Sequence, residues 1–413
     1  MKILMFTQYY PPDIGAQAFR IEALVKALLK RDHKVSVITS EPHRYDLKEK
    51  IQFKKYEKDS KLEIYRIKGG KHNDTFWRRP INYVIFMINS LIYSLRLIHS
   101  GGGYDLVFAT SPPITSAVTA FICAFLKKKD FILEVRDLWP DTLVDLKVFK
   151  NKLIINFLTY IEKILYRKAK LIVVVSEAFK KKIIDKSVNK NKIVIFSNGL
   201  DKDFILNNVN IEMKNIIREK FNIPKDKIVI SYVGNVGISQ NLKIIIRAAE
   251  KIKDNNILFL VVGEGLEKRR LLRLARGKHL DNKILFLNGL PRDKIKDIYR
   301  LSDILFLQLK DLVIFKRTIP SKIFEYLGSG LPIIYGLNGI AADILNESGN
   351  GIKIKPEYDD DLVGAIKTIK NKYDFYVGRA KKGQEFVIKN YMRDVIMKNY
   401  VGTLEKRFLL KQK

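Results

Sequence analysis

Residues 320–332 read P-S-K-I-F-E-Y-L-G-S-G-L-P, a stretch that predicts a short helix, a glycine stop and a new apolar strand. Gly328 or Gly330 is expected to end the helix. Lys322 and Glu325 stand three residues apart and therefore share one helical face. Because a helix N-terminus favours an anion, a lysine in its first turn suits a diphosphate, and a carboxylate one turn deeper suits sugar hydroxyls.

A plainer interpretation of the same residues is an amphipathic helix with an ordinary ion pair between Lys322 and Glu325 on its solvated side. In both interpretations Ser321 is expected to cap the first turn by accepting a hydrogen bond from a backbone N–H group. The helix alone favours the plainer interpretation, because such pairs are common on exposed helices. The rest of the chain decides between the two.

The chain has 413 residues, which is long for a single hydrophobic core and predicts two domains of about 200 residues each. Lysine and arginine exceed aspartate and glutamate by 32, so the protein is expected to be drawn to anionic surfaces such as lipid headgroups or polyphosphates. The basic residues are spread along the chain without an RNA-binding aromatic signature, which argues against a nucleic-acid partner.

Cys123 is the only cysteine, so an intramolecular disulfide and a thiolate metal cluster are both excluded. The sequence opens on the strand-like run Lys2-Ile3-Leu4-Met5-Phe6 and lacks the apolar core and cleavage site of a signal peptide. Together these features predict a protein that works in the reducing cytosol.

Apolar runs of strand length alternate with helical patterns in both halves of the chain, which is typical of parallel, doubly wound α/β sheets. In such sheets ligands bind beyond the carboxyl ends of the strands. Strands are expected at residues 2–7, 35–39, 62–67, 105–109, 131–135 and 171–175 in the first half, and at 228–233, 258–262, 284–288, 304–307 and 332–335 in the second. Closing helices are expected at 359–372, 374–389 and 391–408.

Two loops at strand carboxyl ends in the first half carry candidate site residues. Gly15 begins the first helix, where it would admit a phosphate close to the backbone. Asp137 follows the fifth strand and is expected to bind a substrate hydroxyl, while Arg136 holds an anionic part of a substrate. The alternatives are a glycine needed only for backbone conformation, and an aspartate that caps the next helix with Arg136 as its ion-pair partner.

The loop after residues 228–233 offers an anion-binding site in the second half. The N–H group of Gly234 can contribute to an anion nest, and Asn235 and Gln240 can donate hydrogen bonds to the same ligand. Lys322 and Arg317 would then supply the positive charge.

Two weaker signals follow in the second half. Gly263 begins a G-x-G turn after residues 258–262, and a lone turn of this kind carries little specificity. Arg292 follows the next strand and would meet a nucleobase or a phosphate, although an ordinary surface arginine is the alternative.

Residues 81–98 form an apolar helical pattern that Phe76-Trp77-Arg78-Arg79 precedes. Polar residues such as Asn82 and Ser90 interrupt it too often for a membrane span of about 20 residues. Residues 150–170 form a second, basic amphipathic pattern. Apolar helices with aromatic and basic flanks are typical of interfacial anchors, so we expect contact with an anionic membrane surface. The alternative is a helix buried against the sheet.

Several of these motifs resemble one family. P-S-K-I-F-E-Y-L-G-S-G-L-P, D-L-W-P after Arg136, and the opening Y-Y-P-P-D-I-G-A-Q-A-F-R resemble the retaining nucleotide-sugar glycosyltransferases of family 4. Within it they resemble the O-antigen, capsule and colanic-acid subgroup, such as N-acetyl-L-fucosamine transferases acting on lipid-linked acceptors. The resemblance implies the GT-B fold, in which two Rossmann-like domains face each other across a cleft. Residues 1–200 would bind the acceptor, residues 201–390 would bind the donor, and helix 391–413 would pack back on the first domain.

The resemblance also implies the reaction. We expect retaining transfer of an N-acetylated or deoxy hexose from a UDP-sugar to a lipid-diphosphate-linked saccharide, without metal or cofactor, by a cytoplasmic enzyme peripheral to the inner face of the plasma membrane. Asp137, which would bind the acceptor hydroxyl or the donor sugar, is an expected catalytic residue with Arg136 and Glu325. The expected donor-binding residues are Gly15, Gly234, Asn235, Gln240, Gly263, Arg292, Arg317, Ser321, Lys322 and Glu325. A DxD match at Asp201-Lys202-Asp203 is discounted as a metal site, because a turn is expected there.

The sequence departs from the family pattern at the donor site. Asn235 and Gln240 replace the arginine and lysine that hold the donor diphosphate, Arg317 replaces the first acid of the signature, and Arg136 stands where other members have histidine. These departures keep two rival functions open. One is a nucleotide-sugar epimerase on the same scaffold, and the other is a non-enzymatic module that binds membranes or nucleic acid.

Overall fold

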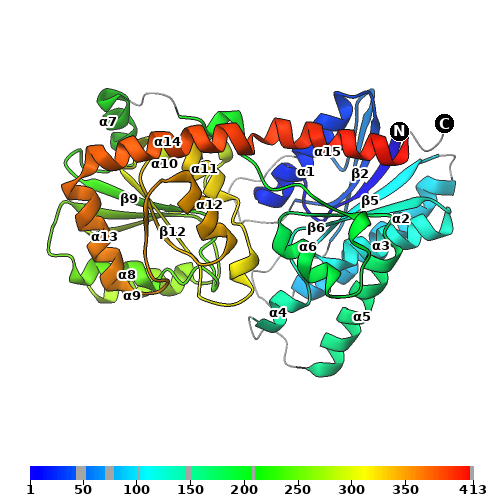
Figure 1. The fold of residues 1–413 in the computed structure, drawn as a ribbon, viewed down its shortest axis with the longest axis horizontal. Coiled ribbons are helices and arrows are strands. Elements are labelled where there is room, and N and C mark those ends of the chain that lie inside the picture. Colours follow the sequence, from blue (N-terminus) through cyan, green and yellow to red (C-terminus); the bar gives the residue numbers. More distant parts are fainter. Residues whose placement is uncertain (43–52, 70–78, 100–102, 146–150, 207–209, 410–413) are drawn as a thin grey trace. The chain divides into compact units, whose positions relative to one another are not determined.

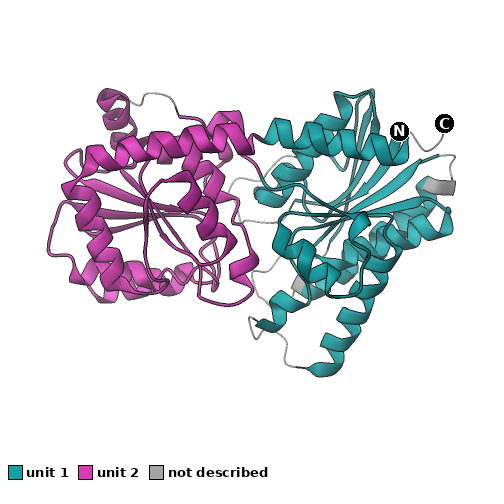
Figure 2. Ribbon diagram, viewed as in Figure 1, with its two compact units in different colours: residues 1–198, 393–413 teal, residues 199–392 magenta. Residues whose placement is uncertain are grey.

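The computed structural model describes residues 1–42, 53–69, 79–99, 103–145, 151–206 and 210–409. The chain divides into two compact units, which Figure 2 shows in different colours. Unit 1 consists of residues 1–198 and 393–413, and unit 2 consists of residues 199–392. Each unit is a parallel β-sheet with helices on both faces (Figure 1), so the predicted doubly wound α/β fold class is confirmed.

Unit 1 is built on an eight-stranded sheet in the order β3-β4-β2-β1-β5-β6-β7-β8, in which only the β3–β4 pair among the described strands is antiparallel. Helices α1 and α15 pack side by side on one face, and α2, α3 and α5 cover the other (Figure 1). The strands are β1 (Lys2–Phe6), β2 (Lys34–Ser40), β3 (Tyr56–Lys58), β4 (Leu62–Ile67), β5 (Leu106–Ser111), β6 (Asp130–Val135), β7 (Leu171–Val174) and β8 (Ile193–Ile195). The helices are α1 (Ala16–Leu29), α2 (Arg79–His99), α3 (Ile114–Leu126), α4 (Asp141–Asp145), α5 (Lys152–Lys168), α6 (Glu177–Ile184) and α15 (Arg393–Phe408).

Unit 2 is built on a six-stranded parallel sheet in the order β11-β10-β9-β12-β13-β14. Helices α8, α9 and α13 bury one face of this sheet, and α10, α11, α12 and α14 lie on the other (Figure 1). The strands are β9 (Ile228–Val233), β10 (Ile257–Val262), β11 (Ile284–Leu287), β12 (Ile304–Gln308), β13 (Ile333–Gly336) and β14 (Ile352–Lys353). The helices are α7 (Ile211–Lys220), α8 (Lys243–Lys251), α9 (Lys268–Gly277), α10 (Arg292–Leu301), α11 (Lys322–Gly328), α12 (Ile340–Ser348), α13 (Asp359–Asn371) and α14 (Tyr373–Tyr391).

The predicted strands all occur, because each central strand is a run of apolar residues that helices bury on both sides. Every residue of β5 and β10 is buried, for example. The sequence did not predict β3, β8 and β14, which have two or three residues each and lie at sheet edges. Such short strands carry too few residues for a recognisable pattern.

Helix α15 completes the core of unit 1 although it comes from the end of the chain. Met397, Tyr400 and Leu404 are buried in the same hydrophobic cluster as residues of β1 and α1. The Tyr400 ring stacks on Phe196, with ring centroids 4.6 Å apart. The segment that carries Phe196 is in turn held by a buried arginine.

That arginine is Arg20 of α1, which is 2% exposed. Its guanidinium donates to the Glu134 carboxylate at 3.1 Å and to the carbonyl oxygens of Phe196 and Ser197, each at 2.7 Å. Arg20 therefore ties α1, β6 and the segment after β8 together. The sequence offered no reason to single it out.

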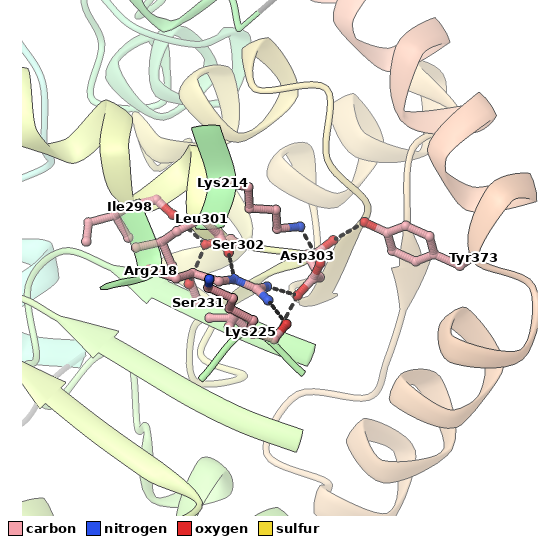
Figure 3. Close-up of polar contacts among 10 residues, drawn as sticks. Lys214, Arg218, Lys225, Ser231, Ile298, Leu301, Ser302, Asp303 and Tyr373 are labelled. Carbon is pink, nitrogen blue, oxygen red and sulfur yellow. Dashed lines mark hydrogen bonds and ion pairs between the residues drawn. The ribbon is translucent and has the colours of Figure 1, made fainter. Parts of the chain in front are cut away.

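A second polar cluster lies at the amino ends of β9 and β12 in unit 2 (Figure 3). The Asp303 carboxylate accepts from the Arg218 guanidinium and from the Val229 N–H group, each at 2.7 Å, and it also pairs with Lys214. Arg218 and Lys214 belong to α7. The cluster anchors α7 to the amino ends of the strands. Ligands bind at the carboxyl ends in such folds, so the cluster lies at the opposite end of the sheet.

Candidate active site

The loops after β9 and β10 run against each other at the carboxyl edge of the unit 2 sheet. The Val236 N–H group donates to the Glu264 carbonyl at 2.8 Å, and the Glu267 N–H group donates to the Val236 carbonyl at 3.0 Å. Gly234 and Gly263 have φ values of +139° and +148°, which favour glycine. A Cβ atom on Gly263 would overlap the carbonyl of Gly234, so the close approach of the two loops needs a glycine at position 263.

Lys322, the first residue of α11, reaches this point. The end of its side chain occupies the space that a Cβ atom on Gly234 would take. The structure therefore brings together the helix and the glycine loop that were expected to bind the same anion, with the end of the lysine side chain beside Gly234. A positive charge and loop amides in one place suit an anionic ligand.

Ser321 does not cap α11, and this prediction was wrong. Its backbone is already helical, with φ −58° and ψ −25°, and its side chain makes no capping hydrogen bond. A capping residue needs an extended backbone to point its side-chain oxygen at the next turn. Ser321 is half-buried immediately before Lys322, so its role as a donor-binding residue stays a prediction.

A buried tyrosine holds Glu325. The Tyr299 hydroxyl, in the last turns of α10, donates to Glu325 Oε2 at 2.8 Å. Burial and the Glu325 charge raise the pKa of Tyr299 well above its ordinary value, so the phenol remains a donor. Next to Glu325, the Tyr326 hydroxyl accepts the N–H group of Val233 at 2.9 Å. The carboxylate is thus fixed relative to the carboxyl end of β9. The sequence analysis missed Tyr299, and a tyrosine in an amphipathic helix gives no signal by itself.

Asn235 and Gln240 contact each other in the loop after β9. Gln240 Oε1 accepts from Asn235 Nδ2 at 3.3 Å and from the Gly237 N–H group at 3.1 Å. The buried Gln308 amide, at the carboxyl end of β12, donates to the carbonyls of Gln240 and Asn241 at 3.2 and 3.1 Å. These contacts brace the loop from both sides, and diphosphate binding by Asn235 and Gln240 stays a prediction.

Arg292 is half-buried at the start of α10 and is not an ordinary surface arginine. It pairs with Asp201, and its guanidinium carbon lies 5.1 Å from the centroid of the Phe204 ring. Phe204 contacts Tyr299 edge-on, so the Phe204 ring links Arg292 to the Tyr299–Glu325 pair. Arg317 is also half-buried and ends the short 3-10 helix Phe315–Arg317.

In the discounted DxD match, Asp201 faces Arg292 and Asp203 lies 3.8 Å from the Lys296 ammonium. Within the described ranges no group of three or more His, Cys, Asp or Glu residues is placed to hold a metal ion. Metal independence stays a prediction.

The candidate residues of unit 1 lie where β6 ends and α1 begins. The Arg136 guanidinium donates to the carbonyl of Gln17 at 3.2 Å, two residues after Gly15 at the N-terminus of α1. Asp137 Oδ1 accepts from the Thr142 hydroxyl of α4 at 2.7 Å. Burial raises the pKa of Asp137, although hydrogen bonds from Thr142 and Trp139 oppose the shift. The structure brings Gly15, Arg136 and Asp137 to one edge of the sheet.

Helix α2 buries three polar residues and exposes several large apolar ones. Asn82, Ser90 and Ser94, which interrupt the apolar pattern, are buried. The exposed large apolar residues of this helix are Ile81, Val84, Ile88 and Ile92. The alternative of a helix buried against the sheet is therefore correct in part, since α2 packs on the sheet with Phe86 buried but leaves these four apolar side chains exposed.

Helix α5 also exposes apolar side chains. Leu153 is 78% exposed, Phe157 is 62% exposed and Tyr160 is 64% exposed, while lysines and arginines occupy other turns of the helix. No helix in the described part of the chain is long and apolar enough to cross a membrane. The predicted flank at Phe76, Trp77 and Arg78 lies outside the described residues.

The architecture, two α/β units each built on a parallel sheet, is that of GT-B glycosyltransferases, and comparison with known proteins agrees. Residues 17–204 match the family described as Glycosyltransferase Family 4, and residues 213–386 match Glycosyl transferases group 1. The chain therefore belongs to the GT-B glycosyltransferase superfamily of group 1 and family 4.

Three similar proteins illustrate this relationship. A colanic acid biosynthesis glycosyl transferase of Escherichia coli, WcaI, is 23% identical over 398 residues, which cover 89% of this chain and 91% of WcaI. The glycosyltransferase MJ1069 of Methanocaldococcus jannaschii is 26% identical over 394 residues, 90% of each chain. The crystal structure of Anabaena HepE in complex with UDP-glucose superposes with a TM-score of 0.74 at 15% identity, covering 98% of this chain and 100% of HepE. At that identity the superposition shows the fold alone.

Proposed function

We propose that this glycosyltransferase is a retaining hexosyltransferase that transfers an N-acetylated or deoxy hexose from a UDP-sugar to a lipid-diphosphate-linked saccharide. The product would enter a bacterial surface polysaccharide such as O-antigen or capsule. The observation that carries the proposal is the position of Lys322 on the loop at Gly234, one helical turn from the anchored carboxylate of Glu325. The UDP-glucose complex of HepE and the colanic acid role of WcaI support the donor and the pathway class.

The geometry of unit 2 suggests how the donor would be held. The Lys322 ammonium and the amides of the loop at Gly234 would bind the diphosphate and stabilise its charge as the glycosidic bond breaks. One oxygen of Glu325 is engaged by Tyr299, and the other would accept from hydroxyls of the nucleotide-sugar. Because Lys322 and backbone amides supply this charge stabilisation, the proposal includes no metal or other cofactor.

Unit 1 would bind the acceptor. The Asp137 carboxylate would accept a hydrogen bond from the attacking hydroxyl, which orients the acceptor oxygen towards the oxocarbenium-like sugar. Arg136 would hold an anionic part of a substrate, which fits a lipid-diphosphate acceptor. Gly15 would admit a phosphate at the N-terminus of α1.

The exposed apolar side chains of α2 and α5 suit contact with a membrane surface, where a lipid-linked acceptor would be found. Exposed apolar chains such as Phe157 and Tyr160 would enter the headgroup boundary, and the surplus of 32 basic residues would attract anionic lipids. We therefore propose peripheral attachment to the cytoplasmic face of the plasma membrane, with no nucleic-acid partner.

A panel of nucleotide-sugars incubated with a membrane lipid extract tests the proposal, with the products identified by mass. Growth of a lipid-linked saccharide by one hexose together with UDP release is the expected result. Conversion of the donor without acceptor would instead indicate an epimerase. Failure to bind any nucleoside diphosphate in calorimetry would indicate a non-enzymatic binding module.

A further inference from the structure

Three aromatic side chains from separate segments meet at the carboxyl edge of the unit 1 sheet. Tyr9 lies in the loop after β1, Tyr83 lies in the second turn of α2, and Trp139 lies in the loop after β6. The hydroxyls of Tyr9 and Tyr83 are 3.3 Å apart. The rings of Tyr83 and Trp139 meet edge to face, with centroids 6.2 Å apart and an interplanar angle of 62°. We name Tyr9, Tyr83 and Trp139 the aromatic cluster.

The aromatic cluster is only half-buried, unlike the aromatic residues of the unit 1 core. All three members keep part of their surface accessible, whereas Phe6 and Phe108 of the neighbouring strands are fully buried. Large rings dominate the energetics of cores and interfaces, and tyrosine and tryptophan are favoured where one end is apolar and the other is wet. A partly accessible group of them beside a candidate catalytic residue is therefore suited to a ligand.

The cluster adjoins Asp137 directly. Trp139 lies two residues after Asp137 in the same loop, and Asp137 Oδ1 accepts from the Thr142 hydroxyl at 2.7 Å. The Trp139 side chain also counteracts the effect of burial on the pKa of Asp137. A molecule that lies on the Trp139 or Tyr83 ring therefore comes within reach of Asp137. The site offers aromatic faces, two phenol hydroxyls and one carboxylate in a small region.

This combination fits a pyranose ring. The axial C–H bonds of a pyranose form an apolar face that stacks on an aromatic ring, while its hydroxyls point outwards and need hydrogen-bond partners. The phenols of Tyr9 and Tyr83 can donate or accept, and the Asp137 carboxylate accepts. A purely apolar lipid chain could use the aromatic faces but would make no hydrogen bond to the two phenols or the carboxylate, whereas sugar hydroxyls can do so.

We infer that the aromatic cluster is the acceptor-sugar subsite, in which the terminal pyranose of the acceptor lies on Trp139 and Tyr83 with its reacting hydroxyl at Asp137. The inference rests on the proposed function and specifies where its acceptor binds. Tyr9 then hydrogen-bonds to a hydroxyl at the rim of the same ring.

Transfer kinetics test the inference with a UDP-sugar donor and a membrane lipid extract as the acceptor. Trp139→Leu and Tyr83→Leu are each expected to raise the KM for the extract about fivefold, since one aromatic contact contributes about 1 kcal/mol. The KM for the UDP-sugar should not change. Trp139→Phe, which keeps a ring but loses the indole N–H group, should recover most of the acceptor KM.

Tyr93→Leu is the matched control. Tyr93 is also a half-buried tyrosine of α2 and also contacts another ring, that of Tyr65, with centroids 5.4 Å apart. This variant should leave both KM values unchanged. If Trp139→Leu raises both KM values equally, or if Tyr93→Leu has the same effect on the acceptor KM, the cluster is structural and the inference fails.

A binding measurement separates this inference from the transfer reaction. The chain has two tryptophans, so Trp77→Phe leaves Trp139 as the single fluorophore. Octyl glycosides of glucose and N-acetylglucosamine, used below their micelle concentrations, should change its emission in a saturable way, and Tyr83→Leu should weaken this response. Absence of any response in the Trp77→Phe protein would overturn the subsite. A response without transfer from any nucleotide-sugar would overturn the proposed function and leave the sugar site standing.

Discussion

The end of the Lys322 side chain occupies the space next to Gly234 that every other amino acid would fill with a Cβ atom. The lysine and the glycine are far apart in sequence. A side chain at position 234 would collide with the end of the Lys322 side chain, which would have to move away from the loop. The two residues together therefore define where the negative charge of a ligand is expected.

The first prediction concerns the charge of Lys322. Lys322→Ala is expected to weaken UDP binding about tenfold or more and to leave uridine binding nearly unchanged, because hydrogen bonds to charged groups contribute about 1.5–3 kcal/mol and uridine has no phosphate. Calorimetry with both ligands measures the difference. Lys382→Ala removes an exposed lysine of α14 and serves as the control. Equal losses for UDP and uridine would contradict a phosphate contact.

Glu325 and the tyrosine that holds it give a second prediction. Glu325→Gln should abolish most transfer with the fold intact, because the side chain keeps its shape and loses its charge. Tyr299→Phe should cause a smaller loss by freeing the carboxylate, and the two changes combined should cost no more than Glu325→Gln alone. Tyr335→Phe removes another buried tyrosine hydroxyl, which donates to Asn346 at 2.6 Å, and should not affect turnover. Unchanged turnover in Glu325→Gln would remove this residue from the site.

The raised pKa of Asp137 gives a prediction in which stability and activity change in opposite directions. The native state holds the Asp137 proton more tightly than the unfolded chain does, so ionisation of this residue destabilises the fold as the pH rises through its pKa. Asp137→Asn should therefore raise the melting temperature at neutral pH while it removes transfer activity. In the unaltered protein, activity should fall on acidification at a higher pH than the pKa of an ordinary aspartate, about 3.9. A lower melting temperature for Asp137→Asn would contradict this account.

The Asp303 cluster of Figure 3 should matter for stability and not for the site. Asp303→Ala leaves the nearly buried Arg218 guanidinium without its carboxylate, which is expected to cost about 3 kcal/mol. A lower urea midpoint with an unchanged UDP affinity at low denaturant is the expected result. Loss of UDP affinity in the folded variant would instead connect the amino end of the sheet to the site.

The membrane prediction uses the exposed apolar residues of α5. Replacing Phe157 and Tyr160 with serine should weaken binding to anionic vesicles in a salt-sensitive flotation assay without changing UDP affinity, because the donor residues belong to unit 2. Phe375→Ser removes an equally exposed ring from unit 2 and is the control. A second variant, Trp77→Ser with Arg78→Glu and Arg79→Glu, tests the flank before α2. Full vesicle binding by both variants would exclude these segments as the anchor.

The fold could be predicted from the sequence because its signals are local. Buried strands such as β5 and β10 are apolar throughout, and helices with one apolar face separate them. The site could be predicted only in part, since Lys322 and Glu325 stand in a recognisable local pattern. Gly234 could also be predicted, because it follows a predicted strand, where ligands bind in such sheets. Tyr299 comes from another helix, and no local pattern shows which of many tyrosines will meet Glu325. The Ser321 cap failed for a local reason, because the backbone of Ser321 itself is already helical.

The position of helix α15 has a consequence for the order in which the protein folds during synthesis. Unit 2 ends at Met392, so all of its residues are available before α15 is made. Most of unit 1 precedes unit 2 in the chain, yet its core lacks Tyr400 and its neighbours until α15, which follows unit 2, has left the ribosome. The half of the chain that is synthesised first is therefore the half that completes its fold last. Until then the apolar face that α15 covers is open to chaperones.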